Sequence, residues 1–361
     1  MVISRTPFRI SFFGGGTDYP GWYTRFGGQV LASTINKYCY LTCRFLPPFF
    51  EHRLRVVYSR IENCQHFEEI QHPSVRETLR HLDMVRGLEI HHDGDLPARS
   101  GMGSSSSFTV GLLHALLALN GRMCSKAQLA LDSIHIEQDL IKETVGSQDQ
   151  ISAAYGGLNH ITFGTDGGFC VNPLTITPER QAELNSHLML FYTGIKRTAS
   201  DVAQSYVAGI EDRGALLTRM GEMVEEGVSI LSSGEDIRRF GELLDDAWRF
   251  KRGLSAKVSN GLVDDMVSAA KAAGALGCKI LGAGGGGFLL VFAPPEAHAA
   301  VAKSLADLIH VPFAFEHSGS RVIFYDTDVE DYSSLDQVRS CRAVREFMEL
   351  GALEQDKRCL S

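Results

Sequence analysis

The sequence lacks the features of a membrane or secreted protein. No stretch of its 361 residues approaches the roughly 18 uninterrupted apolar residues that a membrane helix requires. The N-terminus begins MVISRTPFRISFF, without a basic segment followed by an apolar core and a small-residue cleavage site. We therefore expect a cytoplasmic protein without a membrane partner.

An excess of positive charge is also missing. The chain has 35 Lys and Arg residues against 43 Asp and Glu residues, which gives a net charge of −8 at pH 7. A dedicated nucleic-acid-binding protein usually presents a basic face, so we expect no nucleic-acid partner. A negative total does not exclude an anionic small-molecule substrate, because a local cluster of arginines can override the global field.

Cysteine patterns that would indicate a metal or redox site are absent. The 8 cysteines are scattered, with no CxxC pair and no Cys/His spacing suited to zinc. A chain of this length can bury a sufficient core without disulfides. We therefore expect reduced, buried thiols without a catalytic role.

The apolar patterns predict an α+β protein. Short apolar runs bounded by turn residues predict strands at 8–13, 30–35, 38–45, 88–92, 158–163, 188–192, 278–281, 288–292 and 321–325. Apolar residues at helical spacing predict helices at 109–119, 125–142, 216–231 and 237–248. Strands and helices do not alternate strictly, which favours α+β over a doubly wound sheet.

A polar stretch containing Pro173 and Pro178 is the candidate domain boundary. We expect an N-terminal domain over 1–172, a C-terminal domain over 173–330 and a helical tail over 331–361.

The most informative stretch is Pro97-Ala-Arg-Ser-Gly-Met-Gly-Ser-Ser-Ser-Ser-Phe, at 97–108. Glycines and serines let main-chain N–H groups converge on an anion, and the following helix adds its positive N-terminal end. The alternative is a flexible linker, but a linker would not lie between an apolar strand and an apolar helix. The predicted phosphate-binding residues are Arg99, Ser100, Gly101, Met102, Gly103, Ser104, Ser105 and Ser106.

Two better-known phosphate loops are excluded. The chain has no GxxxxGK[ST] motif, so the loop at 97–108 lacks the lysine of a P-loop. Residues 282–287 match GxGxxG, but the apolar run after them predicts a strand, whereas a dinucleotide fold requires a helix.

Three charged residues could assist phosphoryl transfer, which needs a phosphate cradle, a cation and a group that accepts a proton late in the reaction. Glu137 lies on the helix predicted from residue 125, Asp149 begins a short helix, and Arg9 lies on the first strand. Taken singly, Glu137 is more typical of an exposed helix carboxylate, Asp149 of a helix cap and Arg9 of a surface arginine. Local reasoning therefore predicts an anion site with plausible helpers and stops there.

Taken together, three motifs resemble those of the GHMP kinases, a family that includes galactokinase, homoserine kinase, mevalonate kinase and phosphomevalonate kinase. The motifs are Pro7-Phe-Arg-Ile-Ser-Phe-Phe-Gly-Gly-Gly-Thr-Asp-Tyr at 7–19, the Gly/Ser loop at 97–107 and the glycine run at 282–287, all in family order. The resemblance implies a kinase that uses ATP and Mg²⁺. It also implies an N-terminal α+β domain, a ferredoxin-like C-terminal domain and an active site between them.

The resemblance assigns roles to individual residues. It implies that Ser105 and Glu137 bind Mg²⁺, that Asp149 accepts the proton of the substrate hydroxyl and that Arg9 lies beside it. Met102 and Ser106 replace the usual leucine and alanine, and both are mild departures. The substrate-binding residues implied by the resemblance are Gly15, Gly16, Thr17, Asp18, Gly284, Gly285, Lys196 and Arg197.

Within the family, the sequence is most similar to D-glycero-D-manno-heptose 7-phosphate kinases. That similarity implies phosphorylation of the anomeric hydroxyl to give the 1,7-bisphosphate, in nucleotide-activated heptose synthesis for capsule or lipopolysaccharide. Galactokinases carry Glu-His where this chain has Gly15-Gly16, which suits a larger sugar. Candidates for binding a 7-phosphate are Lys196, Arg197, Lys251 and Arg252, with a solvated basic surface as the alternative.

Two other functions stay open. A kinase of another sugar, resembling fucokinase or galactokinase, shares much of the pattern, and some family members are sugar sensors without turnover. The oligomeric state is also open, with a homodimer as one option.

Overall fold

The computed structural model describes residues 1–195, 199–207, 209, 213–326, 332 and 334. Its spine is one long antiparallel strand pair, β1 (Val2–Phe13) with β2 (Gly28–Phe45). Residues 36–37 continue β2, so the two strands expected at 30–35 and 38–45 are one.

A nine-stranded sheet forms around this pair in the order β13-β1-β2-β5-β3-β4, while β12 and β6 pair with β2, and β7 with β6. The remaining strands of this sheet are β3 (Leu54–Val57), β4 (Ile61–Cys64), β5 (Leu88–Gly94), β6 (Leu158–Phe163), β7 (Phe169–Pro173), β12 (Phe315–Glu316) and β13 (Arg321–Tyr325).

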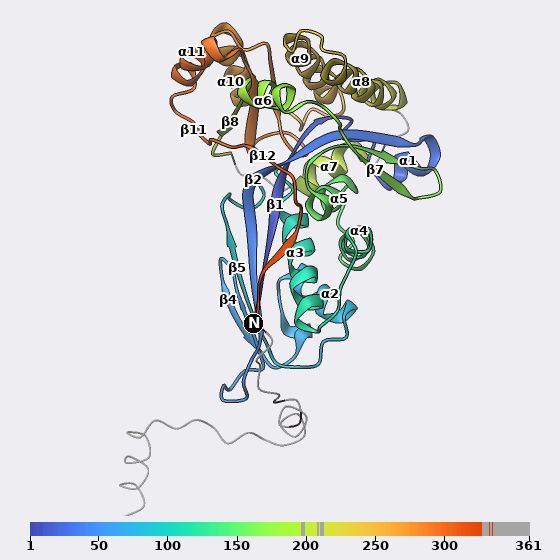
Figure 1. The fold of residues 1–361 in the computed structure, drawn as a ribbon, viewed down its shortest axis with the longest axis vertical. Helices are drawn as coiled ribbons and strands as arrows, with labels where there is room; N and C mark the ends of the chain where they lie inside the picture. Colours follow the sequence, from blue (N-terminus) through green and yellow to red (C-terminus); the bar gives the residue numbers. More distant parts are fainter. Residues whose placement is uncertain (196–198, 208, 210–212, 327–331, 333, 335–361) are drawn as a thin grey trace, which may run out of the picture.

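Helices cover one face of this sheet (Figure 1). They are α2 (Pro73–His81), α3 (Ser104–Leu119), α4 (Lys126–His135), a π-helical turn (Ile136–Leu140) and α5 (Gln148–Tyr155). Helix α3 is apolar on all sides because it packs between two layers. Leu112 and Leu116 join the core shared with β1 and β2, whereas Val110 and Leu113 join the core shared with α4 and α5. This packing fixes the start of α3, and therefore the loop before it.

The second unit is a four-stranded antiparallel sheet in the order β11-β8-β10-β9. Its strands are β8 (Leu188–Tyr192), β9 (Gly277–Ile280), β10 (Phe288–Phe292) and β11 (Ile309–His310). Numbered along the chain, they lie in the order 4-1-3-2, and helices connect β8 to β9 and β10 to β11. This is a ferredoxin-like arrangement, as expected. The helices of this half of the chain are α6 (Pro178–Ser186), α7 (Ala199–Val207), α8 (Gly214–Ser232), α9 (Arg238–Arg252), α10 (Gly261–Ala272) and α11 (His298–Ser304).

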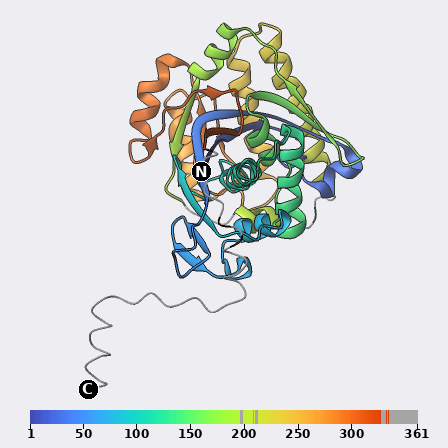
Figure 2. The same cartoon turned by 60° about the horizontal axis from the view of Figure 1, so that its bottom comes forward.

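Both ends of the described chain meet in the first sheet. Strand β13 pairs with β1, and the main-chain N–H of Asp326 donates to the carbonyl of Met1 (2.9 Å). Figure 2 shows the N-terminus against the first sheet from another side. The expected segment 173–330 therefore sends β12 and β13 into the N-terminal sheet, while the boundary at 172/173 stays a prediction. The helical tail expected at 331–361 lies outside the described residues, apart from Tyr332 and Ser334.

Within the described ranges, no helix combines the length and hydropathy of a membrane span, and no group of three His, Cys, Asp or Glu side chains is arranged to hold a metal ion. The described cysteines are free thiols, and burial raises the pKa of Cys43 to about 12.

Candidate active site

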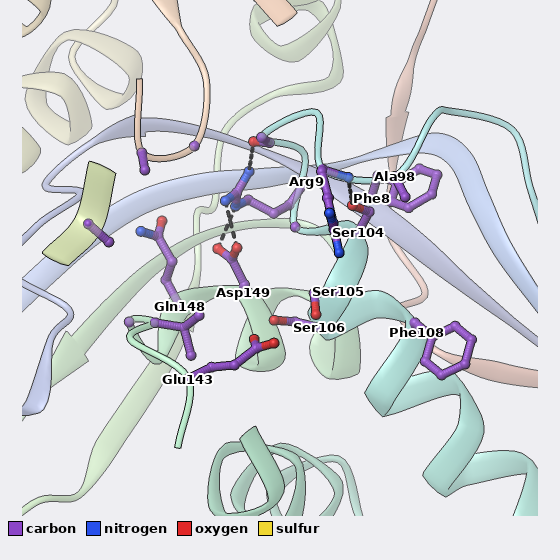
Figure 3. A pocket seen from close by; sticks show the side chains of 18 of the residues that line it. Phe8, Arg9, Ala98, Ser104, Ser105, Ser106, Phe108, Glu143, Gln148 and Asp149 are labelled. Carbon is purple, nitrogen blue, oxygen red and sulfur yellow. Dashed lines mark hydrogen bonds and ion pairs between the residues drawn. The ribbon is translucent and has the colours of Figure 1, made fainter. Parts of the chain in front are cut away.

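A pocket of about 840 Å³ lies where the two units meet. It is lined by the end of β1, the loop before α3, the first turn of α5 and the segment after β9 (Figure 3). The residues predicted from sequence that line it are Arg9, Gly15, Gly16, Asp18, Arg99, Gly101, Gly103, Ser104, Ser105, Ser106, Asp149 and Lys251.

Two glycines shape the loop that is predicted to bind phosphate. Gly101 (φ 82°) and Gly103 (φ 73°) adopt left-handed conformations, and Gly103 is the residue before the first turn of α3. The loop therefore turns sharply into α3. The first N–H groups of this helix have no carbonyl partner within the helix, and they lie at its pocket end. Of the other predicted loop residues, Ser100 donates its hydroxyl to the carbonyl of Pro97 (2.7 Å) and Met102 is buried.

The main chain of the glycine run at 282–287 lies in direct contact with the main chain of this loop. A Cβ on Gly101 would lie 2.5 Å from the carbonyl oxygen of Leu281, and one on Gly287 would lie 2.2 Å from that of Ser100. Gly285 donates its N–H to the carbonyl of Val258. The pocket-lining residues of the run are Gly282 and Ala283. Close packing thus explains much of the glycine content, and substrate contacts by Gly284 and Gly285 stay a prediction.

Replacing Gly101 by alanine is expected to destabilise the protein by about 1–3 kcal/mol more than replacing Gly121. Both glycines have positive φ, but a Cβ on Gly121 meets nothing within 4 Å. The Gly121→Ala variant therefore reports the conformational cost alone, about 1–2 kcal/mol. Chemical denaturation of both variants measures the difference, and equal losses would contradict the close packing.

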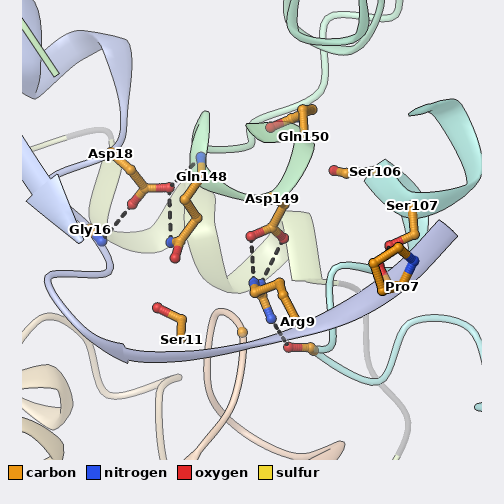
Figure 4. Close-up of polar contacts among 12 residues, drawn as sticks. Pro7, Arg9, Ser11, Gly16, Asp18, Ser106, Ser107, Gln148, Asp149 and Gln150 are labelled. Atoms are coloured by element: carbon orange, nitrogen blue, oxygen red, sulfur yellow. Dashed lines mark hydrogen bonds and ion pairs between the residues drawn. The ribbon is translucent and has the colours of Figure 1, made fainter. Parts of the chain in front are cut away.

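Arg9 connects three parts of the site. Its Nε and Nη2 donate to Asp149 Oδ1 and Oδ2, both at 2.7 Å, and its Nη1 donates to the carbonyl of Gly101 at 2.7 Å (Figures 3 and 4). Because two guanidinium nitrogens donate to the two oxygens of one carboxylate, the pair fixes the orientation of the carboxylate and also balances its charge. The Arg9 side chain is buried, whereas that of Asp149 is 24% exposed. Asp149 is therefore held in place yet accessible from the pocket.

A second carboxylate, Asp18, is buried beside the first turn of α5. It accepts hydrogen bonds from the N–H of Gly16 (2.8 Å) and from Gln148 Nε2 (3.0 Å). Burial raises its pKa above the usual value, and the charge of Asp149 acts in the same direction. Thr17 instead stabilises the turn, since its hydroxyl donates to the carbonyls of Gly14 (2.9 Å) and Gln29 (2.8 Å).

Two lysines of the second unit also line the pocket. Lys279 Nζ donates to the carbonyls of Ser11 (3.0 Å) and Phe12 (2.6 Å). Burial lowers the pKa of Lys279 to about 7, and the charge of Arg9 contributes in the same direction. Lys251 Nζ donates to the carbonyl of Gly282. Local sequence could not indicate Lys279, because a lysine in an apolar strand is normally assigned to its exposed face.

Glu137 lies in the π-helical turn and is fully buried. Its Oε2 accepts hydrogen bonds from Ser106 Oγ (2.8 Å) and Gln150 Nε2 (2.5 Å), while Oε1 has no hydrogen-bond partner. Burial raises its pKa to about 7. Ser105 and Ser106 line the pocket, and Ser106 connects it to Glu137.

An aromatic slot occupies the part of the pocket across Ser104–Ser106 from Asp149, where Figure 3 shows Phe108. The ring of His72 stacks on Phe108 with centroids 4.5 Å apart and meets Tyr58 edge-on at 5.0 Å. Burial lowers the pKa of His72 to about 4, so this ring is neutral at pH 7. Flat, uncharged walls of this kind suit a planar heteroaromatic ring.

The basic residues expected to bind a substrate phosphate fall in different places. Lys251 lines the pocket, whereas Arg252 pairs with Asp264 (3.2 Å) on the surface. Lys196 and Arg197 lie outside the described residues.

Comparison with known proteins agrees with this architecture. The family model "GHMP kinases N terminal domain" matches residues 70–157, and "GHMP kinases C terminal" matches residues 228–307. The first match contains the phosphate loop and Asp149, and the second contains the glycine run.

Individual relatives extend over most of the chain. D-glycero-alpha-D-manno-heptose 7-phosphate kinase of Campylobacter jejuni is 27% identical over 318 residues, covering 84% of this chain and 93% of the relative. A mevalonate kinase of Methanothermobacter thermautotrophicus is 30% identical over 242 residues, covering 62% of this chain and 74% of the relative. The solved structure of a D-glycero-D-manno-heptose 1-phosphate kinase from Bacteroides thetaiotaomicron has the same fold, with a TM-score of 0.73, 22% identity and coverage of 91% of this chain and all of that one.

Proposed function

The chain belongs to the GHMP kinase family and is a phosphotransferase, and from that premise we propose that it moves the γ-phosphoryl group of ATP to a sugar hydroxyl. The observation that carries the proposal is the Arg9–Asp149 pair, which lies in one pocket with the loop 100–106 and with Asp18. A positioned carboxylate beside a phosphate-binding loop is what transfer to a hydroxyl requires.

In the proposed reaction, the triphosphate of ATP lies against loop 100–106 and the N-terminus of α3, with the base in the aromatic slot. Asp149 orients the attacking hydroxyl and accepts its proton late in the transfer. Arg9 holds that carboxylate and neutralises part of the charge on the transferring group. The buried Asp18 binds other hydroxyls of the sugar.

A magnesium ion fits the residues beside the loop. Glu137 does not line the pocket itself, but its buried Oε1 is the type of oxygen that binds a hard cation. Ser105 and Ser106 line the pocket with their hydroxyl oxygens, and the Ser106 hydroxyl donates to Glu137 Oε2. These three residues would hold the ion. When bound, Mg²⁺ supplies positive charge that neutralises the phosphate oxygens.

Replacing Glu137 by glutamine is expected to raise the Mg²⁺ concentration for half-maximal activity by about tenfold or more, because an amide is a weaker ligand than a carboxylate. Asp139→Asn is the control, since its side chain belongs to the same turn but is 68% exposed. Initial rates over a Mg²⁺ series measure the effect. An unchanged Mg²⁺ dependence in Glu137→Gln would remove Glu137 from the metal site.

The proposed substrate is D-glycero-D-manno-heptose 7-phosphate, phosphorylated at the anomeric hydroxyl in the cytoplasm during heptose activation for capsule or lipopolysaccharide. The Campylobacter jejuni relative, which covers most of the chain, supports this choice. So does the space over Gly15, which lines the pocket and where an added Cβ would meet no atom closer than 3.6 Å. The test is ATP consumption with heptose 7-phosphate, L-fucose, D-galactose and mevalonate. Highest kcat/KM with heptose 7-phosphate is expected, and preference for another acceptor would overturn the assignment.

A further inference from the structure

Three pocket-lining residues have a buried polar atom without a hydrogen-bond partner: His72 Nδ1 in the aromatic slot, and Ser11 Oγ and Gln148 Oε1, whose side chains lie together beside Gly15. Ser11 is 5% exposed and Gln148 is 7% exposed. Both residues line the pocket. Leaving a buried polar atom unpaired costs about 1–3 kcal/mol, so a pair of them in one place calls for a physical reason.

The two side chains converge over Gly15. A Cβ on Gly15 would lie 3.6 Å from Ser11 Oγ and 3.6 Å from Gln148 Nε2, which is ordinary van der Waals distance. Gly14 and Gly16 have positive φ, but Gly15 does not, so its backbone conformation does not require glycine. Figure 4 shows the Ser11 hydroxyl and the Gln148 amide facing the same space. Glycine at position 15 keeps that space open.

Both residues are anchored before any ligand arrives, Ser11 through its main chain and Gln148 through its side-chain amide. Lys279 anchors the main chain of Ser11 through the carbonyls of Ser11 and Phe12. Gln148 Nε2 donates to Asp18 Oδ2, which leaves Oε1 as the free end of the amide. A hydrogen-bonding site that is fixed in advance loses little entropy when it binds.

We propose that Ser11 Oγ and Gln148 Oε1, above the Cα of Gly15, form a subsite for hydroxyl groups of the acceptor next to the one that reacts. This inference rests on the proposed function and specifies part of its substrate site. Gln148 Oε1 accepts hydrogen bonds, and the neighbouring Asp18 carboxylate is negatively charged when ionised. The subsite therefore recognises hydroxyl donors, and a phosphate group of the substrate must bind elsewhere in the pocket. Because Gln148 precedes Asp149, these hydroxyls lie close to the site of transfer.

Ser11→Ala tests the subsite, with Ser152→Ala as the matched control. Ser152 Oγ is also buried without a partner, but Ser152 does not line the pocket. Kinetics use the acceptor of the panel above with the highest turnover. Ser11→Ala is expected to raise KM for that acceptor about 3- to 10-fold, as expected for one lost hydrogen bond, with KM for ATP and Tm near wild type. Ser152→Ala is expected to leave both KM values unchanged.

Gly15→Ala is the second variant. Its added methyl group fits the protein without ligand, so Tm and KM for ATP should stay near wild type. It fills the space assigned to the sugar, so kcat/KM for the acceptor should fall by about 10- to 100-fold.

The subsite is overturned if Ser11→Ala has an acceptor KM within twofold of wild type, or if a folded Gly15→Ala has normal acceptor kinetics. In either case, turnover by the wild type still supports the proposed function. If the wild type consumes ATP with no acceptor of the panel, the proposed function fails, and the subsite fails with it.

Discussion

Replacing Asp149 by asparagine is expected to lower kcat by about 10²–10⁴ while KM for ATP stays within a few-fold of wild type. The asparagine amide has nearly the same shape, but it cannot accept the hydroxyl proton or neutralise Arg9. The ATP contacts assigned to loop 100–106 do not involve the Asp149 side chain, so nucleotide affinity should survive.

The measurement is steady-state kinetics, with ATP binding followed by calorimetry on the same sample. Arg9 is buried and would lose its charged partner, so the variant must also be assayed well below its own Tm. A kcat within tenfold of wild type would remove Asp149 from the role of proton acceptor.

Replacing Arg9 by methionine is expected to lower kcat/KM by about 10³ and, unlike Asp149→Asn, to raise KM for ATP as well. Arg9 donates to the carbonyl of Gly101 as well as to both oxygens of Asp149, so its loss frees the loop and the carboxylate together. Losing a charge-assisted pair and a hydrogen bond of a buried arginine typically costs several kcal/mol.

Arg9→Lys is the matched variant, because it keeps the charge but cannot reach three acceptors in the geometry of a guanidinium. Its kcat/KM should lie between those of the wild type and Arg9→Met. If Arg9→Met leaves KM for ATP unchanged, Arg9 does not organise the loop. If both variants lie within tenfold of wild type in kcat/KM, Arg9 takes no part in transfer.

Much of the fold could be predicted because the decisive signals are local. Strands β8, β10 and β13 lie where apolar runs between turn residues predicted them. The loop at 97–108 was apparent in the sequence because its glycines and serines lie between an apolar strand and an apolar helix, and its role in phosphate binding stays a prediction. The nine-stranded sheet was less accessible, because β12 and β13 join it from the far end of the chain and no local pattern specifies that pairing.

The site was predictable only where motifs are contiguous. The aromatic slot combines Tyr58, which follows β3, with His72 just before α2 and Phe108 in α3. Each of these is an ordinary residue in its own segment, and only the folded chain brings them together. Ser11 and Gln148 were missed for the same reason: their significance comes from unpaired atoms, which a sequence does not display.

The glycine run illustrates a different limit. Similarity to the family implied substrate contacts at Gly284 and Gly285, whereas the structure gives Gly284 a reason in packing and Gly285 a reason in its positive φ of 74°. A Cβ on Gly284 would lie 2.7 Å from the carbonyl oxygen of Val258. Motif glycines therefore mark close approach of chains as readily as contact with a ligand.

The most direct test of the account is ³¹P NMR of the wild-type enzyme with Mg-ATP and D-glycero-D-manno-heptose 7-phosphate. Transfer to the anomeric hydroxyl predicts loss of the γ-phosphate signal and growth, in equal amount with ADP, of a new phosphate signal coupled to the proton on C1. ATP that stays intact with this sugar and the rest of the panel would contradict the assignment of this pocket as a sugar kinase site.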